Sequence, residues 1–318
     1  MSGGSTRSRP ERRPTVSVIV VHWNTPQLLT RCLTSIDAAA DGMPFEIVVV
    51  DNGSKGVGKP DLRARKGLCV LRNDRNRGFA AAANQAAAAA RAELLLFLNT
   101  DVELSPGSIA ALARELARDG RLAAIAPIGI AADGSPRFPG MHFLNAVNHS
   151  VALLGLPERG PLARRWRWRG SEGVVEVDWL RASTLLVRAR VFRSVAGFDE
   201  SYFFYEEDED LCWRLARRGH SVSVAAGVHV YDPGGGSTAG AGSWPAASLY
   251  RGQLRFLARR SGPLNVLVYR FSVSAALLVK AMRARLASRE RDGRPPVPTK
   301  ELLRSLWGRS SKASTAHA

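Results

Sequence analysis

The stretch LLLFLNTD, residues 94–101, most constrains how this chain of 318 residues can fold. Its run of five apolar residues is typical of a strand buried on both faces, as in a parallel sheet. The run ends at Asn99, Thr100 and Asp101, and small polar residues at the carboxyl end of such a strand lie where open α/β sheets bind ligands. Asp101 is a hard oxygen ligand of the kind that Mg²⁺ or Mn²⁺ takes alongside substrate phosphates. The alternative is that Asp101 only opens a loop or caps the next helix.

Predicted strands and helices alternate through the N-terminal half of the chain. Thr25 followed by Pro26 indicates the start of a helix, with Thr25 as its N-cap. Strand–helix–strand units of this length form parallel pairs with right-handed crossovers, so the predicted fold class is α/β. Strands are expected at residues 16–21, 47–50, 70–71 and 94–98, and helices at 25–36, 79–92 and 105–120.

Polar residues follow three of the predicted buried strands. Asn24 comes after the first strand, Asp51 ends the second, and Asp101 follows the fourth. Because parallel strands present their carboxyl ends at the same edge of a sheet, we expect these three residues to converge. Such a convergence is typical of a nucleotide site.

The second half of the chain contains its densest acidic cluster, Glu206–Asp210, just before a predicted helix at 211–218. One interpretation is purely structural, because acidic residues stabilise the first turn of a helix. The helical spacing favours another interpretation, since Glu207 and Asp208 precede the inward-facing residues 211 and 212 by four positions. An inward carboxylate is costly unless it is paired or functional. Asp208 is therefore the candidate general base, while Asp210 is placed to pair with Arg214.

Composition limits the partners and the compartment. The formal net charge of +17 favours negatively charged partners such as nucleotide phosphates, anionic lipids or nucleic acid. The three cysteines, Cys32, Cys69 and Cys212, are far apart and odd in number, which argues against a disulfide framework and a zinc site. No segment resembles a signal peptide, and no apolar run is long enough to cross a bilayer. We expect a cytoplasmic protein, either free or peripheral at the inner face of the cell membrane.

The C-terminal part is predicted to form two helices, at residues 244–260 and 264–289. The second helix has an apolar stripe and becomes basic toward its end, so it either packs on the domain or lies on an anionic membrane. The basic patch RRWRWR at 164–169 is either a phosphate or membrane contact or a solvated loop. The expected organisation is a disordered basic tail at 1–14, a main domain at 15–243, C-terminal helices at 244–290, and a mostly disordered tail at 291–318 with a short helix near 302–307.

The chain resembles the family 2 nucleotide-sugar glycosyltransferases, particularly their bacterial rhamnosyltransferase-like members. The resemblance covers roughly residues 16–260 and depends on several motifs that occur in the order of the family. These motifs are VSVIVVHWNTPQLLTRCLTSI, EIVVVDNGSKG, RNDRNRGFAAAANQA, FLNTDVELSPGSI, GFDESYFFYEEDEDLCWRLARRGH and the glycine loop GGGS. Each motif alone is weak evidence, but their order and spacing together are highly specific.

The resemblance implies an A-type nucleotide-sugar fold, a mixed and mostly parallel sheet flanked by helices, with the C-terminal helices as an appendage. Residues 15–243 are then the catalytic domain. It also implies a bound Mg²⁺ or Mn²⁺ and inversion at the sugar anomeric carbon. Glu207 and Asp208 resemble the catalytic Glu-Asp pair, with Asp208 as the base, and Asp101 resembles the metal-bridging carboxylate of the DxD-type motif. Residues implied to contact the nucleotide sugar are Val21, Asn24, Asp51, Asn52, Gly78, Asn84, Asn99 and Thr100, with Asp51 at the base.

Three departures from the family pattern stand out. Asn99 occupies the first position of the DxD-type motif, which leaves one carboxylate there for the metal. The family often places a further metal ligand before the glycine loop, and the candidates here are His229, Tyr231 and Asp232. The family often has a Gly-Ala pair after Trp-Leu, whereas this chain has Arg-Ala-Ser at 181–183, which changes the expected acceptor pocket.

The predicted function is transfer of a sugar, with rhamnose as a candidate, from a dTDP- or UDP-linked donor to a hydroxyl of a glycan or lipid-linked acceptor. The first alternative keeps the fold but uses a UDP-hexose and a natural-product acceptor. The second alternative is a non-catalytic protein that binds membranes or nucleic acid through its positive charge. Nucleic acid is not the expected partner, because such a binding module needs neither Asp101 nor an inward Asp208.

Overall fold

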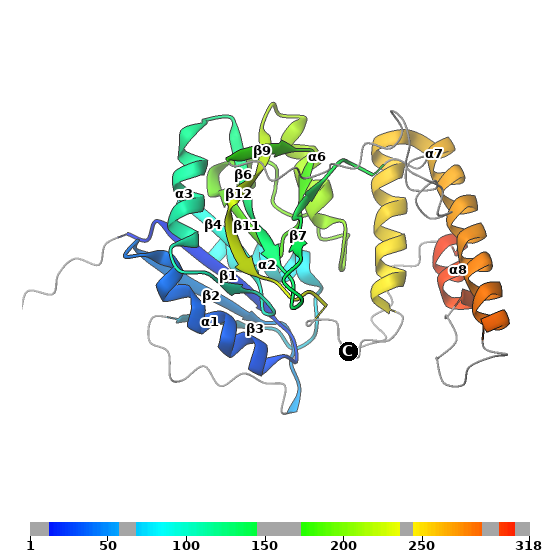
Figure 1. Cartoon of the computed structure of the whole chain (residues 1–318), viewed down its shortest axis with the longest axis horizontal. Coiled ribbons are helices and arrows are strands. Elements are labelled where there is room, and N and C mark those ends of the chain that lie inside the picture. Colours follow the sequence, from blue (N-terminus) through cyan, green and yellow to red (C-terminus); the bar gives the residue numbers. More distant parts are fainter. Residues whose placement is uncertain (1–12, 57–67, 145–172, 236–243, 288–298, 309–318) are drawn as a thin grey trace, which may run out of the picture.

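A computed structural model of the chain describes residues 13–56, 68–144, 173–235, 244–287 and 299–308. Figure 1 shows one α/β body that contains the central sheet, with the C-terminal helices at one side of it. Most of the predicted tails, the basic patch at 164–169 and the second half of the GGGS loop at 234–237 lie outside the described residues.

The central sheet has the strand order β3-β2-β1-β4-β11-β6-β12-β5. Strands β3, β2, β1 and β4 are parallel, β11 is antiparallel to β4 and β6, and β12 runs parallel to β6. The strands of this path are β1 (Val16–His22), β2 (Phe45–Asp51), β3 (Leu68–Arg72), β4 (Leu94–Asn99), β5 (Glu103–Leu104), β6 (Leu122–Ile130), β11 (Thr184–Arg188) and β12 (Ser221–Tyr231). Four short strands add β7 (Pro136–Arg137) to β6, β9 (Val174–Val177) to β12, and a separate pair of β8 (Gly140–Met141) with β10 (Trp179–Leu180).

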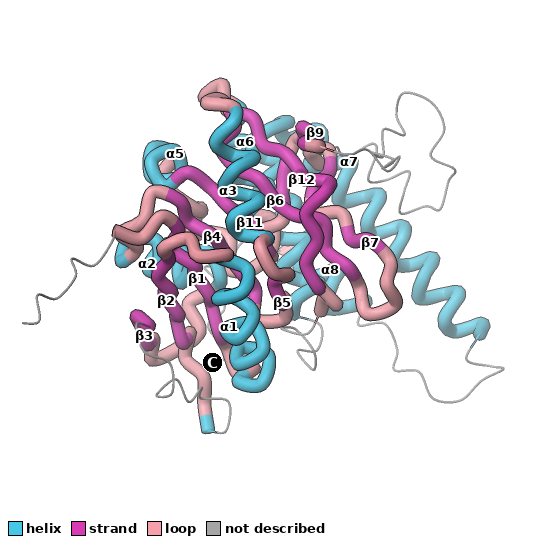
Figure 2. Tube along the Cα trace, turned by 60° about the vertical axis from the view of Figure 1, so that its left-hand side comes forward, coloured by secondary structure: helices cyan, strands magenta, loops and turns pink. Residues whose placement is uncertain are grey.

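Helices cover both faces of the sheet, as Figure 2 also shows. Along β1, the side chains of Val18 and Val20 join the apolar core under α1 and α3, while Ile19 joins the core under α2, α5 and α6. This alternation explains why the strands are continuous apolar runs, because each is buried on both faces. The helices of this layer arrangement are α1 (Pro26–Ala40), α2 (Phe79–Ala89), α3 (Ser108–Arg118), α5 (Ala189–Ser194) and α6 (Glu207–Ala216).

The nine-residue strand β6 lies near the middle of the sheet, where the sequence predicted no strand. Pro127 within it made a loop the expected structure, because proline lacks the N–H that a central strand donates. The partner strand accommodates it: the pairing of β12 with β6 shifts register between Ala225 and His229, opposite Pro127. The sequence pattern predicts two short strands, at 222–225 and 228–231, and that bulge explains why the structure has the single strand β12 instead.

The C-terminal elements are α7 (Trp244–Ala287) and α8 (Thr299–Trp307). Gly262, with φ of 78°, and Pro263 break α7 into the two predicted segments, which pack against each other and against α8 through a small core that includes Leu257, Tyr269 and Leu306. By length and composition, α7 is apolar enough over Pro245–Val279 to cross a membrane, which the sequence analysis had not expected. The break at Gly262 divides that length and gives a helical hairpin (Figure 1).

Candidate active site

The carboxyl ends of β1, β2 and β4 meet at one edge of the sheet, as predicted. In the strand register His22 lies opposite Asp51, and Val21 lies between Val50 and Asn99. Because these strands are parallel neighbours, the loops that follow them are also adjacent. The predicted convergence of polar strand ends is therefore present, and the following paragraphs describe how each side chain is held.

Asp51 and Asn24 are tied to the loop after β2. The Asp51 carboxylate accepts hydrogen bonds from the Ser54 backbone N–H at 3.0 Å and from Nη1 of Arg72 at 3.2 Å. The Asn24 backbone N–H donates to Oγ of Ser54 at 2.9 Å, and its side-chain oxygen accepts from the Lys55 N–H at 3.0 Å. Asp51 is thus a buried carboxylate that accepts two hydrogen bonds and fixes the shape of this loop.

Asn52 organises the next loop, residues 73–78. Its side-chain oxygen accepts from Nδ2 of Asn73 at 3.0 Å and from the Arg77 N–H at 3.1 Å, and its Nδ2 donates to Oδ1 of Asn76 at 2.9 Å. Gly78 has φ of 83°, and a Cβ there would collide with the Phe203 carbonyl oxygen, so this position requires glycine. The loop after β3 and the segment around Phe203 therefore approach each other at Gly78.

These loops enclose a solvent-open hollow of about 560 Å³, here called the nucleotide hollow. Five of its lining residues were predicted and six were not. The predicted ones are Val21, Asn52, Gly78, Asn99 and Thr100, and the others are Trp23, Thr25, Asn76, Phe79, Phe203 and Phe204. Phe203 and Phe204 come from a loop about a hundred residues away from the rest, so only the folded chain reveals that they line this hollow. A hollow with aromatic walls and a few amides and hydroxyls suits a planar base with polar substituents.

Thr25 differs from its predicted role. Helix α1 starts after Thr25 as expected, but the Thr25 side chain makes no capping hydrogen bond. Its hydroxyl lies 3.3 Å from Nδ1 of His22 and 3.2 Å from Oγ1 of Thr100. The hydroxyl is therefore directed to the site and does not accept from the N–H groups of the first turn of α1.

Asn84 is not brought into the nucleotide hollow. Its amide oxygen accepts from the Phe198 N–H at 3.0 Å, and its Nδ2 donates to the Phe198 carbonyl at 2.8 Å and to Oε1 of Glu200 at 3.2 Å. These bonds attach helix α2 to the turn that precedes the acidic cluster.

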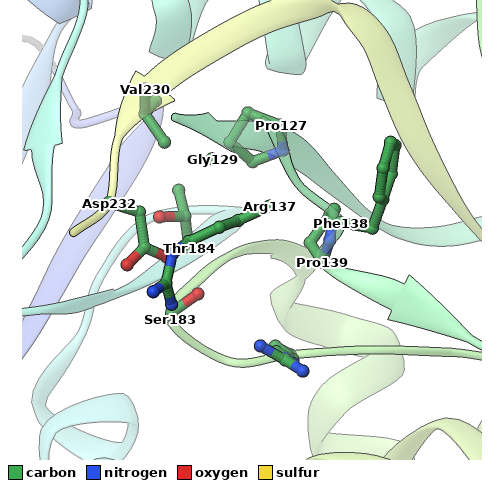
Figure 3. A pocket seen from close by; sticks show the side chains of 10 residues that line it. Pro127, Gly129, Arg137, Phe138, Pro139, Ser183, Thr184, Val230 and Asp232 are labelled. Carbon is green, nitrogen blue, oxygen red and sulfur yellow. The ribbon is translucent and has the colours of Figure 1, made fainter. Parts of the chain in front are cut away.

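Asp101 and Asp232 form a carboxylate pair at the sheet edge. Asp101 is buried in the loop after β4, and Asp232 follows β12. Burial raises the pKa of Asp232 and the nearby Asp101 charge raises it further, while Arg137, the Ser183 hydroxyl and Arg181 act in the opposite direction. Figure 3 shows Asp232 and Arg137 pointing toward each other.

His229 is the other residue before the glycine loop that was predicted as a metal ligand. It is exposed on β12, three residues before Asp232, and residues an odd number apart on a strand point to opposite faces. No described contact joins it to Asp101 or Asp232. Within the described part of the chain, no group of three His, Cys, Asp or Glu side chains is arranged to hold a metal. The available donor set is therefore the two carboxylates.

The segment Arg181–Ser183, where the chain departs from the family pattern, connects three parts of the site. The Ala182 N–H donates to Oδ2 of Asp208 at 3.1 Å. The Ser183 carbonyl accepts from the Asn99 N–H at 2.9 Å, and the Ser183 hydroxyl bonds to Asp232. The start of helix α6, the end of β4 and the end of β12 are thus held in one place by adjacent residues.

Asp208 lies in the first turn of α6, which begins at Glu207. The residue is half-buried, and burial by the surrounding protein raises its pKa, while the Ala182 and Glu209 N–H groups and the Arg181 charge lower it in part. Glu207 is buried, its Oε2 has no hydrogen-bond partner among the described residues, and burial raises its pKa strongly. The predicted pair of carboxylates therefore lies at the helix start, and Asp208 is the less buried of the two residues.

The backbone before this pair is strained. Tyr205 and Glu206 have φ values of 71° and 72°, a left-handed conformation that non-glycine residues rarely adopt. Strain of this kind persists where the surrounding structure imposes it, and it occurs often at functional sites. Here it turns the chain from the aromatic wall of the nucleotide hollow directly into helix α6.

Asp210 and Arg214 form the predicted pair, with Nε of Arg214 2.6 Å from Oδ2 of Asp210. Asp210 is nevertheless fully buried, although the helical spacing placed it off the inward stripe. The reason is that the first segment of α7 covers this side of α6, where Nη1 of Arg259 lies 3.1 Å from Oδ1 of Asp210 and also pairs with Asp199. The C-terminal helices are therefore linked by ion pairs to the helix that carries Asp208.

Known proteins resemble this chain in sequence. The model of a protein family described as glycosyl transferase family 2 matches residues 17–179. An N-acetylglucosaminyl-diphospho-decaprenol L-rhamnosyltransferase of Mycobacterium tuberculosis is 31% identical over 217 residues, which cover 64% of this chain and 70% of the relative. The rhamnosyltransferase WbbL of Escherichia coli is 46% identical over 56 residues, 17% of this chain and 21% of the relative.

Solved structures share the fold. The mannosyltransferase PcManGT from Pyrobaculum calidifontis, in complex with GDP-Man and Mn²⁺, has a TM-score of 0.54 and 18% identity, covering 92% of this chain and 79% of that one. GalNAc-T7 with UDP, GalNAc and Mn²⁺ has a TM-score of 0.52 and 15% identity, covering 78% of this chain and 48% of that one. At such identities the likeness concerns the fold alone, and it confirms the predicted A-type nucleotide-sugar fold with its mostly parallel sheet and C-terminal helices.

Proposed function

The chain belongs to glycosyl transferase family 2, and from this premise we propose that it transfers a sugar from a nucleotide-diphosphate donor to an acceptor hydroxyl with inversion. The observation that carries the proposal is the segment 181–183, which holds Asp208 beside the Asp101–Asp232 pair at the edge of the nucleotide hollow. A base, a pair of metal-ligating carboxylates and a nucleotide site are what this reaction requires.

We assign the donor nucleotide to the nucleotide hollow. Trp23, Phe203 and Phe204 offer apolar surfaces for the base, while Asn99 and Thr100 lie at the end of β4 beside the carboxylate pair. Asp51 and Asn52 contribute by fixing the loops, since their carboxylate and amide groups are bonded within the protein. The donor diphosphate then extends from the hollow toward Asp101.

We assign Mg²⁺ or Mn²⁺ to Asp101 and Asp232. The donor set fits, because both are hard oxygen ligands close enough to influence each other, and Mg²⁺ commonly takes one or two carboxylates together with substrate phosphates. When bound, the cation would neutralise charge on the departing nucleoside diphosphate. His229 is not included, because it is exposed on β12 and no described contact joins it to either carboxylate.

Asp208 is the proposed general base. It accepts the acceptor hydroxyl proton as the hydroxyl oxygen bonds to the anomeric carbon and the bond from that carbon to the donor phosphate oxygen breaks. One displacement from the opposite face inverts the configuration, so no covalent nucleophile is required. The raised pKa of Asp208 brings its basicity closer to a working pH near neutrality. Buried Glu207 is a positioning residue next to it.

The relatives indicate the sugar and the acceptor. Two of them are named rhamnosyltransferases, and one of these acts on N-acetylglucosaminyl-diphospho-decaprenol by its name. We therefore propose that rhamnose is the sugar transferred and that the acceptor is a lipid-linked glycan of the cell envelope.

A lipid-linked acceptor requires access to a membrane, and the C-terminal helices present a suitable surface. Exposed large apolar residues gather on the second segment of α7, with Trp307 of α8 nearby. They are Leu264, Leu267, Val268, Phe271, Leu278, Val279 and Met282, and they are here called the apolar face. Given the net charge of +17, we propose that this face lies on the anionic surface of the cytoplasmic membrane leaflet. The predicted division into a catalytic domain at 15–243 and C-terminal helices at 244–290 then separates chemistry from membrane contact.

A thermal-shift screen of the purified protein against dTDP- and UDP-sugars, with and without Mn²⁺, tests the donor site. We expect one nucleotide class to raise the melting temperature, and Mn²⁺ to increase that rise. If no nucleotide sugar changes the melting temperature of a folded protein, the proposed function is wrong.

A further inference from the structure

The geometry points to a phosphate-binding subsite formed by Arg137, Arg181 and the hydroxyl of Thr184, in a hollow joined to the nucleotide hollow by the Asn99–Ser183 hydrogen bond. This inference deepens the proposed function, because it assigns a second phosphate group to the reaction. The ligand class is a phosphate or diphosphate. Its two candidate sources are the acceptor, as in a sugar carried on a lipid diphosphate, and the donor.

The subsite is a second hollow of about 270 Å³ that opens to solvent between β6, β7 and the start of β11. It is separate from the nucleotide hollow, and the Asn99–Ser183 hydrogen bond joins the walls of the two. The enclosed space is small, so its ligand would be a compact charged group that binds at the solvent-open mouth, beside the exposed Arg181.

Two arginines bring positive charge to this hollow, whose lining contains one carboxylate, Asp232. The Arg137 side chain lies against the backbone at Gly234, where a Cβ would collide with the guanidinium. A Cβ on Gly129 would likewise approach Asp232 at 3.0 Å and Arg137 at 3.3 Å. The close packing at both glycines holds the Arg137 guanidinium beside the carboxylate pair, and planar guanidinium groups match phosphate oxygens well.

Arg181 directly precedes Ala182, whose N–H bonds to Asp208, and it lines the same hollow as Asp232. Its charge lowers the pKa of both carboxylates. Its own side chain is exposed, while its backbone N–H donates to the Pro139 carbonyl at 2.6 Å. An anion on Arg181 would therefore lie close to the base that touches the acceptor hydroxyl.

Thr184 gives independent evidence for a ligand. The residue is only 2% exposed, it lines this hollow, and its hydroxyl finds no hydrogen-bond partner among the described residues. A buried hydroxyl without a hydrogen-bond partner destabilises the folded chain. Figure 3 shows the Thr184 side chain in the hollow near Asp232 and Arg137, where a phosphate oxygen would accept its hydrogen bond.

Binding of inorganic diphosphate, measured by calorimetry with EDTA present, tests the subsite without the metal. We expect Arg137→Gln and Arg181→Gln each to weaken this binding at least about tenfold. Arg190→Gln is the matched control, because Arg190 is exposed on α5, at the opposite end of β11 from Thr184. Thr184→Val should weaken binding and raise the melting temperature, since it removes an unpaired buried hydroxyl without changing side-chain shape. Equal binding by wild type and both arginine variants would overturn the proposal.

Steady-state kinetics then identify the source of the phosphate. Two acceptors with the same sugar are compared, one on a lipid diphosphate and one on an uncharged alkyl chain. If the acceptor supplies the phosphate, Arg181→Gln raises the KM of the diphosphate acceptor alone; if the donor does, it raises the donor KM with both acceptors. Either result supports the subsite, and unchanged KM values for all substrates contradict it. Failure of the wild-type enzyme to transfer sugar to either acceptor would instead contradict the proposed function.

Discussion

The backbone N–H of Ala182 donates a hydrogen bond to Oδ2 of Asp208 at 3.1 Å. This contact joins the start of helix α6 to the segment before β11, whose next residue, Ser183, bonds to both Asp232 and Asn99. The proposed base is thereby held relative to the proposed metal ligands by hydrogen bonds from adjacent residues of one segment. Hydrogen bonds from neighbouring residues of this kind hold reacting groups in a productive geometry.

Asp208→Asn tests the base. Asparagine keeps an oxygen that accepts the Ala182 N–H, so the local geometry should persist while the proton-accepting carboxylate is lost. We expect the kcat of sugar transfer to fall roughly 10²–10⁴-fold, with the donor Kd within about twofold of wild type. Single-turnover kinetics and donor titration measure both quantities. A variant with wild-type turnover would move the role of base to another residue.

Asp101→Ala tests the metal ligand. Removing one of two carboxylates should abolish the effect of Mn²⁺ on donor binding, because the remaining Asp232 alone would hold the cation weakly. Donor titration with Mn²⁺ or with EDTA measures this effect. Glu93→Gln is the matched control, since Glu93 is exposed at the opposite end of β4. If Mn²⁺ strengthens donor binding equally in Asp101→Ala and wild type, Asp101 is not a metal ligand.

Glu209 predicts an unusual dependence of stability on pH. Burial raises the pKa of Glu209 from 4.5 to about 7, and burial next to Glu209 raises the pKa of Glu206. Between pH 4.5 and about 7, Glu209 holds a proton in the folded protein and has lost it in the unfolded chain. The free energy of unfolding should therefore fall as the pH rises through this range. We expect a higher melting temperature near about pH 5 than near about pH 8.

Glu209→Gln is the variant that checks this assignment, because glutamine cannot titrate. Its melting temperature should change less between the two pH values than that of wild type. Carboxylates with lowered pKa values, such as Asp199, act only at lower pH, so they do not obscure the comparison. An identical pH dependence in both proteins would show that Glu209 does not titrate in this range.

The apolar face predicts binding to membranes. Co-sedimentation with vesicles should be strong for anionic phospholipid, weak for zwitterionic phospholipid, and reduced by salt. Leu264→Glu combined with Phe271→Glu should remove most of it, whereas Val174→Glu, which changes an exposed apolar residue on β9, should not. Unchanged vesicle binding, or a changed oligomeric state without an effect on vesicles, would mean that the apolar face binds something else.

The sequence predicted the part of the fold that depends on local pattern. Continuous apolar runs identified β1, β2 and β4, and their polar ends identified the sheet edge near Asp51 and Asp101. Strand β6 escaped prediction because Pro127 is tolerated only through the bulge in β12, which is a property of the partner strand. The hydrophobic pattern of residues 122–130 carries no information about a bulge in the partner strand β12.

The sequence points to candidate site residues that belong to a recognisable motif. It does not point to residues that join the candidate site only through packing between distant segments. Asp101 and Asp208 stand out in the sequence, but Phe203 and Phe204 line the nucleotide hollow only because Gly78 lets their loop approach. Asp210 was placed off the inward stripe of α6, and Arg259 of α7 buries it from outside. Each missed feature depends on a contact between segments that are distant along the chain.

The most direct test of the proposed function is a transfer reaction followed by proton NMR. Wild-type protein, dTDP-rhamnose, a lipid diphosphate-linked glycan acceptor and Mn²⁺ are mixed, and the anomeric signal of the product is compared with that of the donor. We predict a new glycoside with inverted anomeric configuration, formed by wild type and not by Asp208→Asn. A product with retained configuration, or equal rates in the two proteins, would contradict a single displacement with Asp208 as the base.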